Sequence, residues 1–588
     1  MTLTKHEFLV LRACAMHEVS SQRGIAEAAG LSLGSVNGAC KALMSAGLLD
    51  FPYKTTKAGL KRLDPYRVEN AVIMAAGFSS RFAPISYDKP KGVLRVRGEV
   101  LIERQIRQLQ EAGIENIIVV VGYMKESFFY LEDKFGVTIA VNEAYTSRNN
   151  NSTLMLVKEH LGNTYVCSSD DYFTENVFSP YEYKAYYSAV YFEGKTDEYC
   201  LTTGSGNRIT EVSCGGADAY GMLGHVYFDR AFSRAFIGVL EEDYDKPETA
   251  SKLWEDVYID HIKELDMTMK PFDKGVVYEF DSLDDLRAFD QDFIENVDSE
   301  ILDNICTVLG CSRGAIVDIE PIKEGLTNLS FRFTCNGSTY VYRHPGAGTE
   351  EIVNRDSEAF SQSVAKSLGI DDTFIFEDPA KGWKLSAFVA DCVAFDYHDA
   401  DHVERALALI RRLHTSGVSS PWSFDVYEKA QEIVALLGER SYPSFPDFGE
   451  LADRAERLSE CVRQDGVEKV LCHNDFYNPN FLVRDDVMYL VDWEYSAMSD
   501  YANDLGTFVC CSDYTVAEAE EVFARYFDRK PSEAERRHCL AYVSISAYYW
   551  FVWALYKESA GDPVGEWLYL WYRAAKTYGK RAMELYGT

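Results

Sequence analysis

The chain has 588 residues, and at about 150 residues per domain this length favours roughly four domains. Its composition, with 47% hydrophobic, 13% aromatic and 26% charged residues, excludes a mainly disordered, collagen-like or coiled-coil protein. The formal charge of −33, from 59 basic and 92 acidic residues, argues against general adhesion to nucleic acid or anionic lipid.

The cysteines and the hydropathy pattern indicate where the protein resides. None of the 14 cysteines forms a Cys-x-x-Cys pair, and the closest two, Cys510 and Cys511, are adjacent, which disfavours a zinc ribbon and a thioredoxin-like motif. Charged residues interrupt the apolar runs near the N-terminus, and no run of 18 apolar residues occurs. We therefore expect a cytoplasmic protein with free thiols and without membrane insertion.

Residues 1–66 have a helical pattern. In QRGIAEAAGLSLGSVNGACKALMSAGLL, Ala26, Gly30 and Val36 have the spacing of a small residue, a turn glycine and an apolar residue in helix-turn-helix units. The segment resembles a winged helix-turn-helix domain. Its expected recognition helix carries Lys41 as its single basic residue. Because phosphate neutralisation dominates DNA affinity, DNA binding and a regulatory or dimerisation role both stay open.

Residues 69–295 alternate strand-like runs with helix-like stretches, which predicts an α/β fold with a mostly parallel sheet. The first strand leads into the loop AAGFSSRFAPISYDKPKGVL. Small residues in this loop let the backbone approach a nucleotide, and basic residues suit a triphosphate. These residues are Ala75, Ala76 and Gly77, followed by Arg81 and Lys91.

The loop pattern AAGxSSR…PKGVL resembles the signature of sugar-phosphate and alcohol-phosphate nucleotidyltransferases, which have a Rossmann-like fold. NEAYTSRNNNSTLML, YVCSSDD, SKLWEDVYIDHIKELD and VYEFDSLDDL further resemble bacterial CTP:phosphocholine cytidylyltransferases. The resemblance implies that Arg81 and Lys91 stabilise charge on the α-phosphate and on leaving pyrophosphate. It also implies that Asp170 and Asp281 hold Mg²⁺ against CTP.

Other positions depart from this pattern or extend it. Relatives often have Asp-x-Asp at the first metal position, and because Ser168 stands at its start here, only Asp170 carries over cleanly. A role for Asp171 stays open. Tyr123, in a VGY turn, matches a base-pocket loop and is a candidate for nucleotide contact.

A quaternary ammonium group cannot donate an N–H hydrogen bond, so its recognition calls for aromatic faces and a nearby carboxylate. Tyr199 and Trp254 match aromatic positions of the phosphocholine pocket, and Glu255 or Asp256 would supply the negative charge. For Trp254, a place in the core of the α/β domain is the alternative.

The third segment, residues 297–588, contains HNDFYNPNFLV followed by MYLVDWEY, which has the kinase catalytic-loop spacing H-x-D-x-x-x-x-N. Phosphoryl transfer needs a carboxylate that accepts the alcohol proton and oxygen ligands that hold Mg²⁺. Asp475 is the expected base, and Asn480 and Asp492 are the expected metal ligands. Upstream, EGLTNLSFRF is expected to form a hairpin that covers the ATP phosphates.

HNDFYNPN, DWEY and an arginine on the third strand resemble bacterial choline kinases of the aminoglycoside-phosphotransferase-like family. The resemblance implies a kinase-like α+β fold in which Arg343 takes the place of the nucleotide-binding lysine and pairs with Glu358. Trp550 and Trp553 lie three apart on one helix face, like the W-x-x-W of the choline site in that family; a buried aromatic stripe is the alternative. The other pocket candidates are Glu494 and Tyr495.

The two signatures explain each other, because one would make the substrate of the other. We expect a bifunctional enzyme that phosphorylates choline with ATP and transfers CMP from CTP to phosphocholine, giving CDP-choline and pyrophosphate. Ethanolamine or another amino alcohol is the alternative substrate, and a DNA-binding regulator with CTP- and choline-sensing domains is the alternative class. The product would serve surface-glycan decoration or phospholipid synthesis, and DNA and a second copy of the chain stay open as partners.

Overall fold

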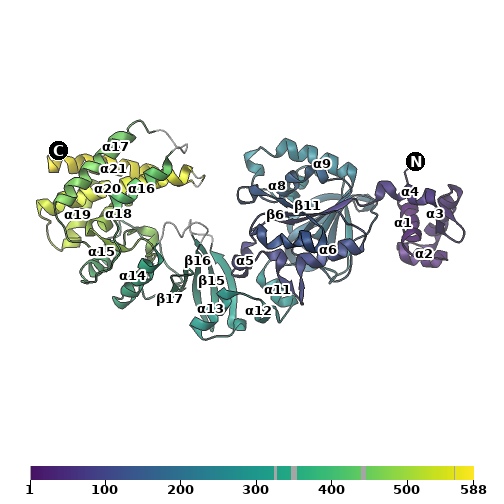
Figure 1. Ribbon diagram of the computed structural model, residues 1–588, viewed down its shortest axis with the longest axis horizontal. Helices are drawn as coiled ribbons and strands as arrows, with labels where there is room; N and C mark the ends of the chain where they lie inside the picture. The colour runs from purple at the N-terminus through teal and green to yellow at the C-terminus, as the bar shows by residue number, and fades with distance from the viewer. Residues whose placement is uncertain are drawn as a thin grey trace. The chain divides into compact units, whose positions relative to one another are not determined.

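The computed structural model describes residues 2–322, 328–345, 354–438, 445–559, 561 and 563–587. The chain divides into two compact units, Met1–Thr307 and Val308–Thr588 (Figure 1). The division therefore falls about ten residues after the border expected near 295–297, and it leaves the first 66 residues in one unit with the middle segment.

Four short helices and a small hairpin form the beginning of the first unit. These elements are α1 (Lys5–Met16), α2 (Gln22–Ala29), α3 (Leu33–Ser45), β1 (Leu49–Asp50), β2 (Lys54–Thr55) and α4 (Lys57–Leu63). Thr4 and Glu7 form a capping box at the start of α1, which satisfies backbone N–H groups of the first turn. Gly30 ends α2 with φ 63°, so the predicted left-handed corner between the helices is confirmed. Phe8, Val36 and Leu43 are buried among these helices.

A seven-stranded sheet organises the rest of the first unit, in the order β12-β10-β11-β8-β3-β6-β7. Its strands are β3 (Asn70–Ala75), β6 (Ile117–Val121), β7 (Thr138–Val141), β8 (Thr164–Ser168), β10 (Tyr186–Thr203), β11 (Ile209–Phe228) and β12 (Thr268–Phe272). β3 runs parallel to both β6 and β8, whereas β11 is antiparallel to β8 and β10. The sheet is thus mixed, with a parallel part where a mostly parallel sheet was predicted.

Helices cover both faces of this sheet, which explains why its central strands are continuous apolar runs. The helices are α6 (Leu101–Glu111), α7 (Tyr130–Phe135), α8 (Asn151–Leu156), α9 (Arg230–Asp243) and α10 (Trp254–Asp260). Ile102 and Ile106 of α6 pack with Ile73 of β3 on one face, and Phe232 and Phe236 of α9 belong to the core on the other. Three short helices follow near the end of the unit: α11 (Leu283–Phe289), α12 (Phe293–Asn296) and α13 (Glu300–Leu309).

The second unit begins with an antiparallel five-stranded sheet in the order β14-β15-β16-β18-β17. Its strands are β14 (Ile316–Ile322), β15 (Asn328–Cys335), β16 (Ser338–Pro345), β17 (Phe374–Asp378) and β18 (Trp383–Ala387), and α14 (Arg355–Ser367) lies between β16 and β17 in the chain. The predicted phosphate-covering hairpin includes residues 323–327, which lie outside the described residues.

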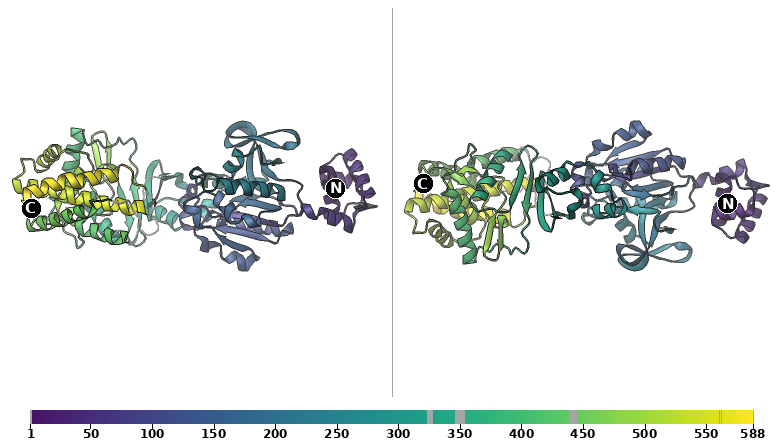
Figure 2. Two further views of the ribbon diagram at one scale, coloured as in Figure 1. Left: turned by 90° about the horizontal axis from the view of Figure 1, so that it is seen from above. Right: turned by 90° about the horizontal axis from the view of Figure 1, so that it is seen from below.

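Helices form most of the remaining part of the second unit. They are α15 (Ala400–His414), α16 (Val426–Leu437), α17 (Phe448–Gln464), α18 (Tyr501–Cys510), α19 (Val516–Phe527), α20 (Glu533–Ser559) and α21 (Trp567–Tyr586). Figure 2 shows the two long yellow helices α20 and α21 side by side. By length and composition α20 could cross a membrane, but 83% of its most apolar window is buried inside the protein, as in the central helix of a folded core.

Candidate active sites

The loop after β3 lines a cavity of about 640 Å³ in the first unit. Ala75, Ala76 and Gly77 contribute the small side chains that the sequence singled out, and Lys91 and Asp170 line the same cavity. Asp170 follows the end of β8, the strand that pairs in parallel with β3, so both loops leave the sheet at the same edge. In α/β sheets, ligands bind at the carboxyl ends of parallel strands.

Carboxylates gather beside this cavity. Asp170, Asp171 and Glu279 each offer an oxygen within 4.8 Å of the others, and Lys91 forms an ion pair with Asp170. Burial, with Glu279 and Asp170 nearby, raises the pKa of Asp171 well above its usual value, and burial with Asp170 nearby raises the pKa of Glu279 to about 8. Hard oxygen ligands of this kind suit Mg²⁺, and a buried Asp171 oxygen has no hydrogen-bond partner among the described residues.

Glu279 is the member of this carboxylate cluster that the sequence analysis missed. It lies on β13 (Val277–Glu279), which pairs with β9 (Asp171–Phe173) so that Glu279 stands opposite Asp171. Asp281, the expected second metal ligand, instead forms a 2.9 Å ion pair with Arg81. Among the described residues, Glu279 and not Asp281 belongs to the carboxylate cluster with Asp170. The role of Asp281 as a metal ligand stays a prediction. The sequence signal for Glu279 was the VYEFD run, in which alternate residues of a strand share a face.

Two other nucleotide candidates lie beside the cavity without lining it. The exposed guanidinium of Arg81 pairs with Asp281, so Arg81 meets a carboxylate that could compete with a phosphate. The hydroxyl of Tyr123 donates to the carbonyl of Ser86 at 3.0 Å, and its ring packs edge-on against Phe78, which does line the cavity. Tyr123 thus contacts residues of the nucleotide loop and does not line the cavity, which corrects the expectation that it contacts the base directly.

The expected phosphocholine cage is only partly present. Trp254 is fully buried in the core, stacked on Tyr187 at 5.9 Å and edge-on to Phe228, which corrects the expectation that its face meets ligand. The reason is that the first residue of α10 points its large apolar ring toward the sheet. Tyr199 donates to Asp256 at 2.9 Å, and neither lines the cavity.

Glu255 does not line the cavity itself, but it contacts a residue that does. Its carboxylate accepts hydrogen bonds from Asn150, at 3.3 Å, and from Tyr187, and Asn150 lines the cavity. Burial raises the pKa of Glu255 to about 7, although these hydrogen bonds oppose the rise. Of the four expected cage residues, Glu255 contacts the cavity residue Asn150 through its side chain, and Trp254 contacts it through its backbone N–H, which donates to Asn150 Oδ1 at 2.7 Å.

The kinase catalytic loop lies in the second unit between β19 (Val470–Cys472) and β20 (Phe481–Arg484). The amide of Asn480 donates 2.8 Å hydrogen bonds to both the carboxylate and the carbonyl of Asp475. Burial and the neighbouring Asp492 raise the pKa of Asp475 well above its usual value. One buried Asp475 oxygen has no hydrogen-bond partner among the described residues, so this oxygen can accept a proton from a substrate hydroxyl.

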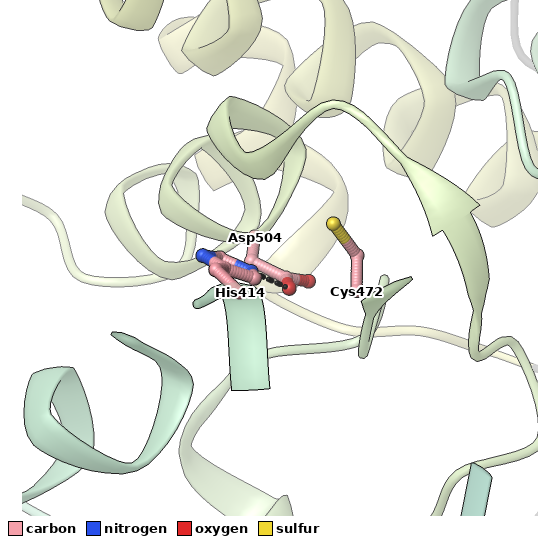
Figure 3. A group of neighbouring side chains, drawn as sticks. All are labelled: His414, Cys472 and Asp504. Atoms are coloured by element: carbon pink, nitrogen blue, oxygen red, sulfur yellow. Dashed lines mark hydrogen bonds and ion pairs between the residues drawn. The ribbon is translucent and has the colours of Figure 1, made fainter. Parts of the chain in front are cut away.

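A buried histidine–aspartate pair anchors that loop from behind (Figure 3). Asp504 accepts hydrogen bonds from the backbone N–H groups of His473, at 2.9 Å, and Asn474, at 2.6 Å, and pairs with Nε2 of His414 at 2.9 Å. His414, Cys472 and Asp504 have the spacing of a metal site. Figure 3 shows His414 and Asp504 joined by a hydrogen bond, with the sulfur of Cys472 within 4.8 Å of both ligand atoms. The Asp504 oxygens already accept hydrogen bonds from the loop backbone and pair with His414.

Arg343 and Glu358 form a buried ion pair of 2.6 Å, the pairing that the resemblance implies. Despite burial, Arg343 and Lys384 lower the pKa of Glu358 to about 2, so this carboxylate stays charged. Arg343 also lies 3.9 Å from Asp492. The strand β16 and the helix α14 thus hold the guanidinium next to an expected metal ligand.

A cavity of the kinase domain, about 320 Å³ in volume and rich in aromatic side chains, includes Glu494 and Tyr495 of the DWEY segment in its wall. Trp553, Glu494 and Tyr495 line it as expected from the sequence, and the sequence analysis missed Trp422, Tyr549 and Glu432. Trp550 does not line it: its ring is 7% exposed and packs against Tyr477, Tyr549 and Trp571. For Trp550, the buried stripe is therefore the better description. Burial and Asp492 raise the pKa of Glu494 to about 7.

Comparisons with known families find a nucleotidyltransferase match in the first unit and a phosphotransferase match in the second. Residues 71–170 match the MobA-like NTP transferase domain, and residues 372–539 match the phosphotransferase enzyme family. The choline-phosphate cytidylyltransferase of Streptococcus pneumoniae is 34% identical over 221 residues, which cover 38% of this chain and 96% of that protein. The chain belongs to the choline-phosphate cytidylyltransferase family. Since it also contains a phosphotransferase domain, it joins a nucleotidyltransferase and a kinase-like enzyme in one polypeptide.

Two further similarities extend over one domain each. The 2-aminoethylphosphonate cytidylyltransferase of Lancefieldella rimae is also 34% identical, over 229 residues that cover 38% of this chain and 93% of that protein. The solved structure of the choline kinase LicA from Streptococcus pneumoniae has 24% sequence identity and a TM-score of 0.42, covering 48% of this chain and 98% of that protein.

Proposed function

We propose that the kinase domain phosphorylates choline with ATP, and that the cytidylyltransferase domain transfers CMP from CTP to the phosphocholine. The products of the second step are CDP-choline and pyrophosphate. One observation carries the choice of alcohol: the cavity at Glu494 and Tyr495 is lined by Trp422, Tyr549 and Trp553 together with the carboxylates of Glu432, which pairs with Lys429, and Glu494. Aromatic faces and carboxylates favour a quaternary ammonium, which has no N–H to donate.

In the kinase step Asp475 accepts the hydroxyl proton as the alcohol oxygen attacks the γ-phosphorus of ATP, and ADP leaves. Arg343, held by Glu358, lies where its charge would meet ATP phosphates. Asn480 and Asp492 are the residues that would hold Mg²⁺. Mg²⁺ held there would neutralise negative charge on the ATP phosphates.

In the cytidylyl step a phosphocholine oxygen attacks the α-phosphorus of CTP and pyrophosphate leaves. The backbone at Ala75, Ala76 and Gly77 approaches the nucleotide, and Lys91 offers its charge to the phosphates. Asp170, Asp171 and Glu279 would hold Mg²⁺, since their oxygens lie within 4.8 Å of one another. ATP and CTP both belong to the cytoplasm, which is the compartment that this proposal requires.

Two other substrates are specific alternatives. One relative is named for 2-aminoethylphosphonate, and its identity to this chain equals that of the choline-phosphate relative. A kinase makes a P–O ester and never a C–P bond, so the fused kinase favours a phosphate ester over a phosphonate. Ethanolamine is the second alternative, because Glu432 and Glu494 could accept hydrogen bonds from a primary ammonium.

A substrate comparison tests the proposal. Purified full-length protein is incubated with ATP, CTP and Mg²⁺ plus choline, ethanolamine or 2-aminoethylphosphonate, and products are identified by mass spectrometry. We expect CDP-choline to form fastest, with phosphocholine as an intermediate. A CMP-phosphonate without ATP consumption, or faster turnover of ethanolamine, would overturn the choice of choline.

For the first 66 residues we propose a winged helix-turn-helix module, on the support of α2, α3 and the hairpin β1–β2. The exposed face of α3 carries Leu33, Asn37 and Lys41, so a single cation faces outward. This favours a regulatory module over a DNA reader. Salt-sensitive, sequence-selective DNA binding by the full chain, measured by gel shift, would reverse that preference.

A further inference from the structure

The first unit contains a second cavity, about 550 Å³ in volume, that shares no lining residue with the nucleotide cavity. We call it the α1 cavity. Lys5, Phe8, Leu9 and Arg12 of α1 form one wall, and the opposite wall comes from residues 182–186, 205–208 and 266–271. Its volume is that of sites which take small molecules or cofactors. The chemistry of the two catalytic domains makes no use of it.

The charge of the α1 cavity is opposite to that of the chain. Five cationic side chains line it against two carboxylates, a surplus of three positive charges in a protein of net charge −33. The cations are Lys5, Arg12, Lys184, Arg208 and Lys270, and the carboxylates are Glu182 and Asp266. Such a concentration of one sign inside a hollow attracts small polyanions.

The ion pairs show that the surplus is built into the cavity. Asp266 is shared by Lys184, at 2.6 Å, and Arg208, at 3.3 Å. Glu182 is shared by Lys270, at 2.8 Å, and Arg12, at 3.7 Å. Each carboxylate thus neutralises one of its two cations, and Lys5 forms no ion pair with any described residue.

The cavity also has an apolar side that is held in place. Phe8, Leu9, Met269 and Pro271 line it. The ring of Phe8 is fully buried against Tyr66, at 4.9 Å, and Tyr183, at 5.4 Å, so Leu9 and Pro271 supply most of the accessible apolar surface. A hydrogen bond of 3.2 Å from the hydroxyl of Tyr183 to the carbonyl of Leu3 joins α1 to the catalytic domain. A ligand with several negative charges and a flat apolar part therefore matches both sides.

We propose that the α1 cavity is an effector site for a nucleoside triphosphate, distinct from the CTP substrate site. The triphosphate meets the surplus cations, and the base packs against the apolar wall of α1. This gives the first 66 residues a role that needs no DNA: they complete a binding site that the catalytic domain alone would leave open.

Glu182 connects this site to the chemistry. Its carboxylate accepts hydrogen bonds from the hydroxyls of Tyr165, at 3.0 Å, and Tyr186, at 3.3 Å, in addition to pairing with Lys270. Tyr165 lies on β8, and Asp170 follows the end of this strand by two residues. A bound triphosphate would draw Lys270 and Arg12 away from Glu182. The hydrogen bond from Tyr165 to Glu182 would then change, and Tyr165 lies on β8, the strand that leads to Asp170.

Photolabelling of the full chain with 8-azido-ATP tests the site without any need for turnover. We expect label in two places: the kinase domain, and peptides that contain Lys5–Arg12 or residues 182–186 and 266–271. In the double variant Lys5→Glu/Arg208→Glu, label at the second place should fall about tenfold or more, whereas kinase label stays constant and reports an intact fold. Lys195→Glu, an exposed charge reversal on β10 that lines neither cavity, is the matched control.

The effector role is tested by pyrophosphate release from CTP and phosphocholine, with and without added ATP. We expect ATP to change this rate in the wild type and the control, but not in the double variant, whose basal rate stays normal. Label confined to the kinase domain and to peptides of the nucleotide cavity, or equal label in the double variant, would overturn the site. Competition by tripolyphosphate as strong as by ATP would overturn the nucleoside specificity, and an unchanged rate at full labelling would overturn the effector role.

Discussion

The aromatic cavity of the kinase domain permits a sharp test with two tryptophans of one helix. Trp553 lines the cavity, whereas Trp550, three residues earlier on α20, is buried among other rings. The ammonium of Lys557 lies 5.7 Å from the centre of the Trp553 ring, so this face already accepts a cation. Replacing each tryptophan with leucine keeps apolar bulk and removes the π face.

The two substitutions should change different quantities: the KM for choline at Trp553 and the free energy of unfolding at Trp550. A desolvated contact between a cation and a tryptophan face is worth about 1–2 kcal/mol, so Trp553→Leu should raise the KM for choline about five- to thirtyfold with little change in the KM for ATP. Trp550→Leu should instead cost about 2–3 kcal/mol of stability, because it leaves a void among packed aromatic rings. Its KM for choline should change by less than about twofold.

The assay is coupled ADP release with choline or ATP varied, together with urea unfolding of both variants. Ethanolamine serves as a second substrate, for which the loss at Trp553→Leu should be smaller. The reasoning would be refuted by an unchanged KM for choline in Trp553→Leu, or by equal rises for choline and ATP. A large KM effect in Trp550→Leu with normal stability would place the choline site at the cluster of Trp550, Tyr477 and Trp571.

The remaining predictions concern the catalytic carboxylates and one pH effect. Asp475→Asn should abolish choline phosphorylation and leave cytidylyl transfer intact, and Asp170→Ala should do the reverse; loss of both activities in either folded variant would contradict separate sites. Glu279→Gln should slow cytidylyl transfer far more than Asp281→Asn does, as measured by pyrophosphate release at several Mg²⁺ concentrations, and the opposite ranking would restore Asp281 as the ligand. His538 is buried, which lowers its pKa, but two aspartates bonded to its ring raise the pKa overall; its contribution to stability is therefore full below about pH 6.5 and is lost as the pH rises through the raised pKa. His538→Gln should thus destabilise the protein more at pH 6 than at pH 9 in urea unfolding, and a pH-independent loss would refute the assignment.

Local patterns predicted the parts of the sites that depend on spacing within one segment. The loop at Ala75–Gly77 follows a strand directly, and Asp475 and Asn480 are fixed five residues apart by one turn. In both cases the chain between the residues is short enough for sequence spacing to set geometry. The pairing of Arg343 with Glu358 was expected instead from the resemblance to choline kinases.

The site residues that the sequence did not predict are placed by contacts between segments far apart in the chain. Glu279 meets Asp171 only because β13 pairs with β9 in one register, and a shift by one residue would turn Glu279 away from the carboxylate cluster. Trp422 and Tyr549 reach one cavity from a loop and from α20, and no spacing links them. Trp254 was misplaced for the opposite reason, since a tryptophan at the start of a helix has the same pattern in a core as in a pocket.

The two catalytic domains use buried cations differently. In the kinase domain Arg343 is held by Glu358, whose lowered pKa keeps the pair charged whether or not nucleotide is bound. In the cytidylyltransferase domain Lys91 pairs with Asp170, one of the three carboxylates that would hold Mg²⁺. A metal ion bound there would draw Asp170 away from Lys91 and would leave the ammonium for the phosphates of CTP. The lysine would then have an anionic partner both without and with substrate, as a buried charge requires.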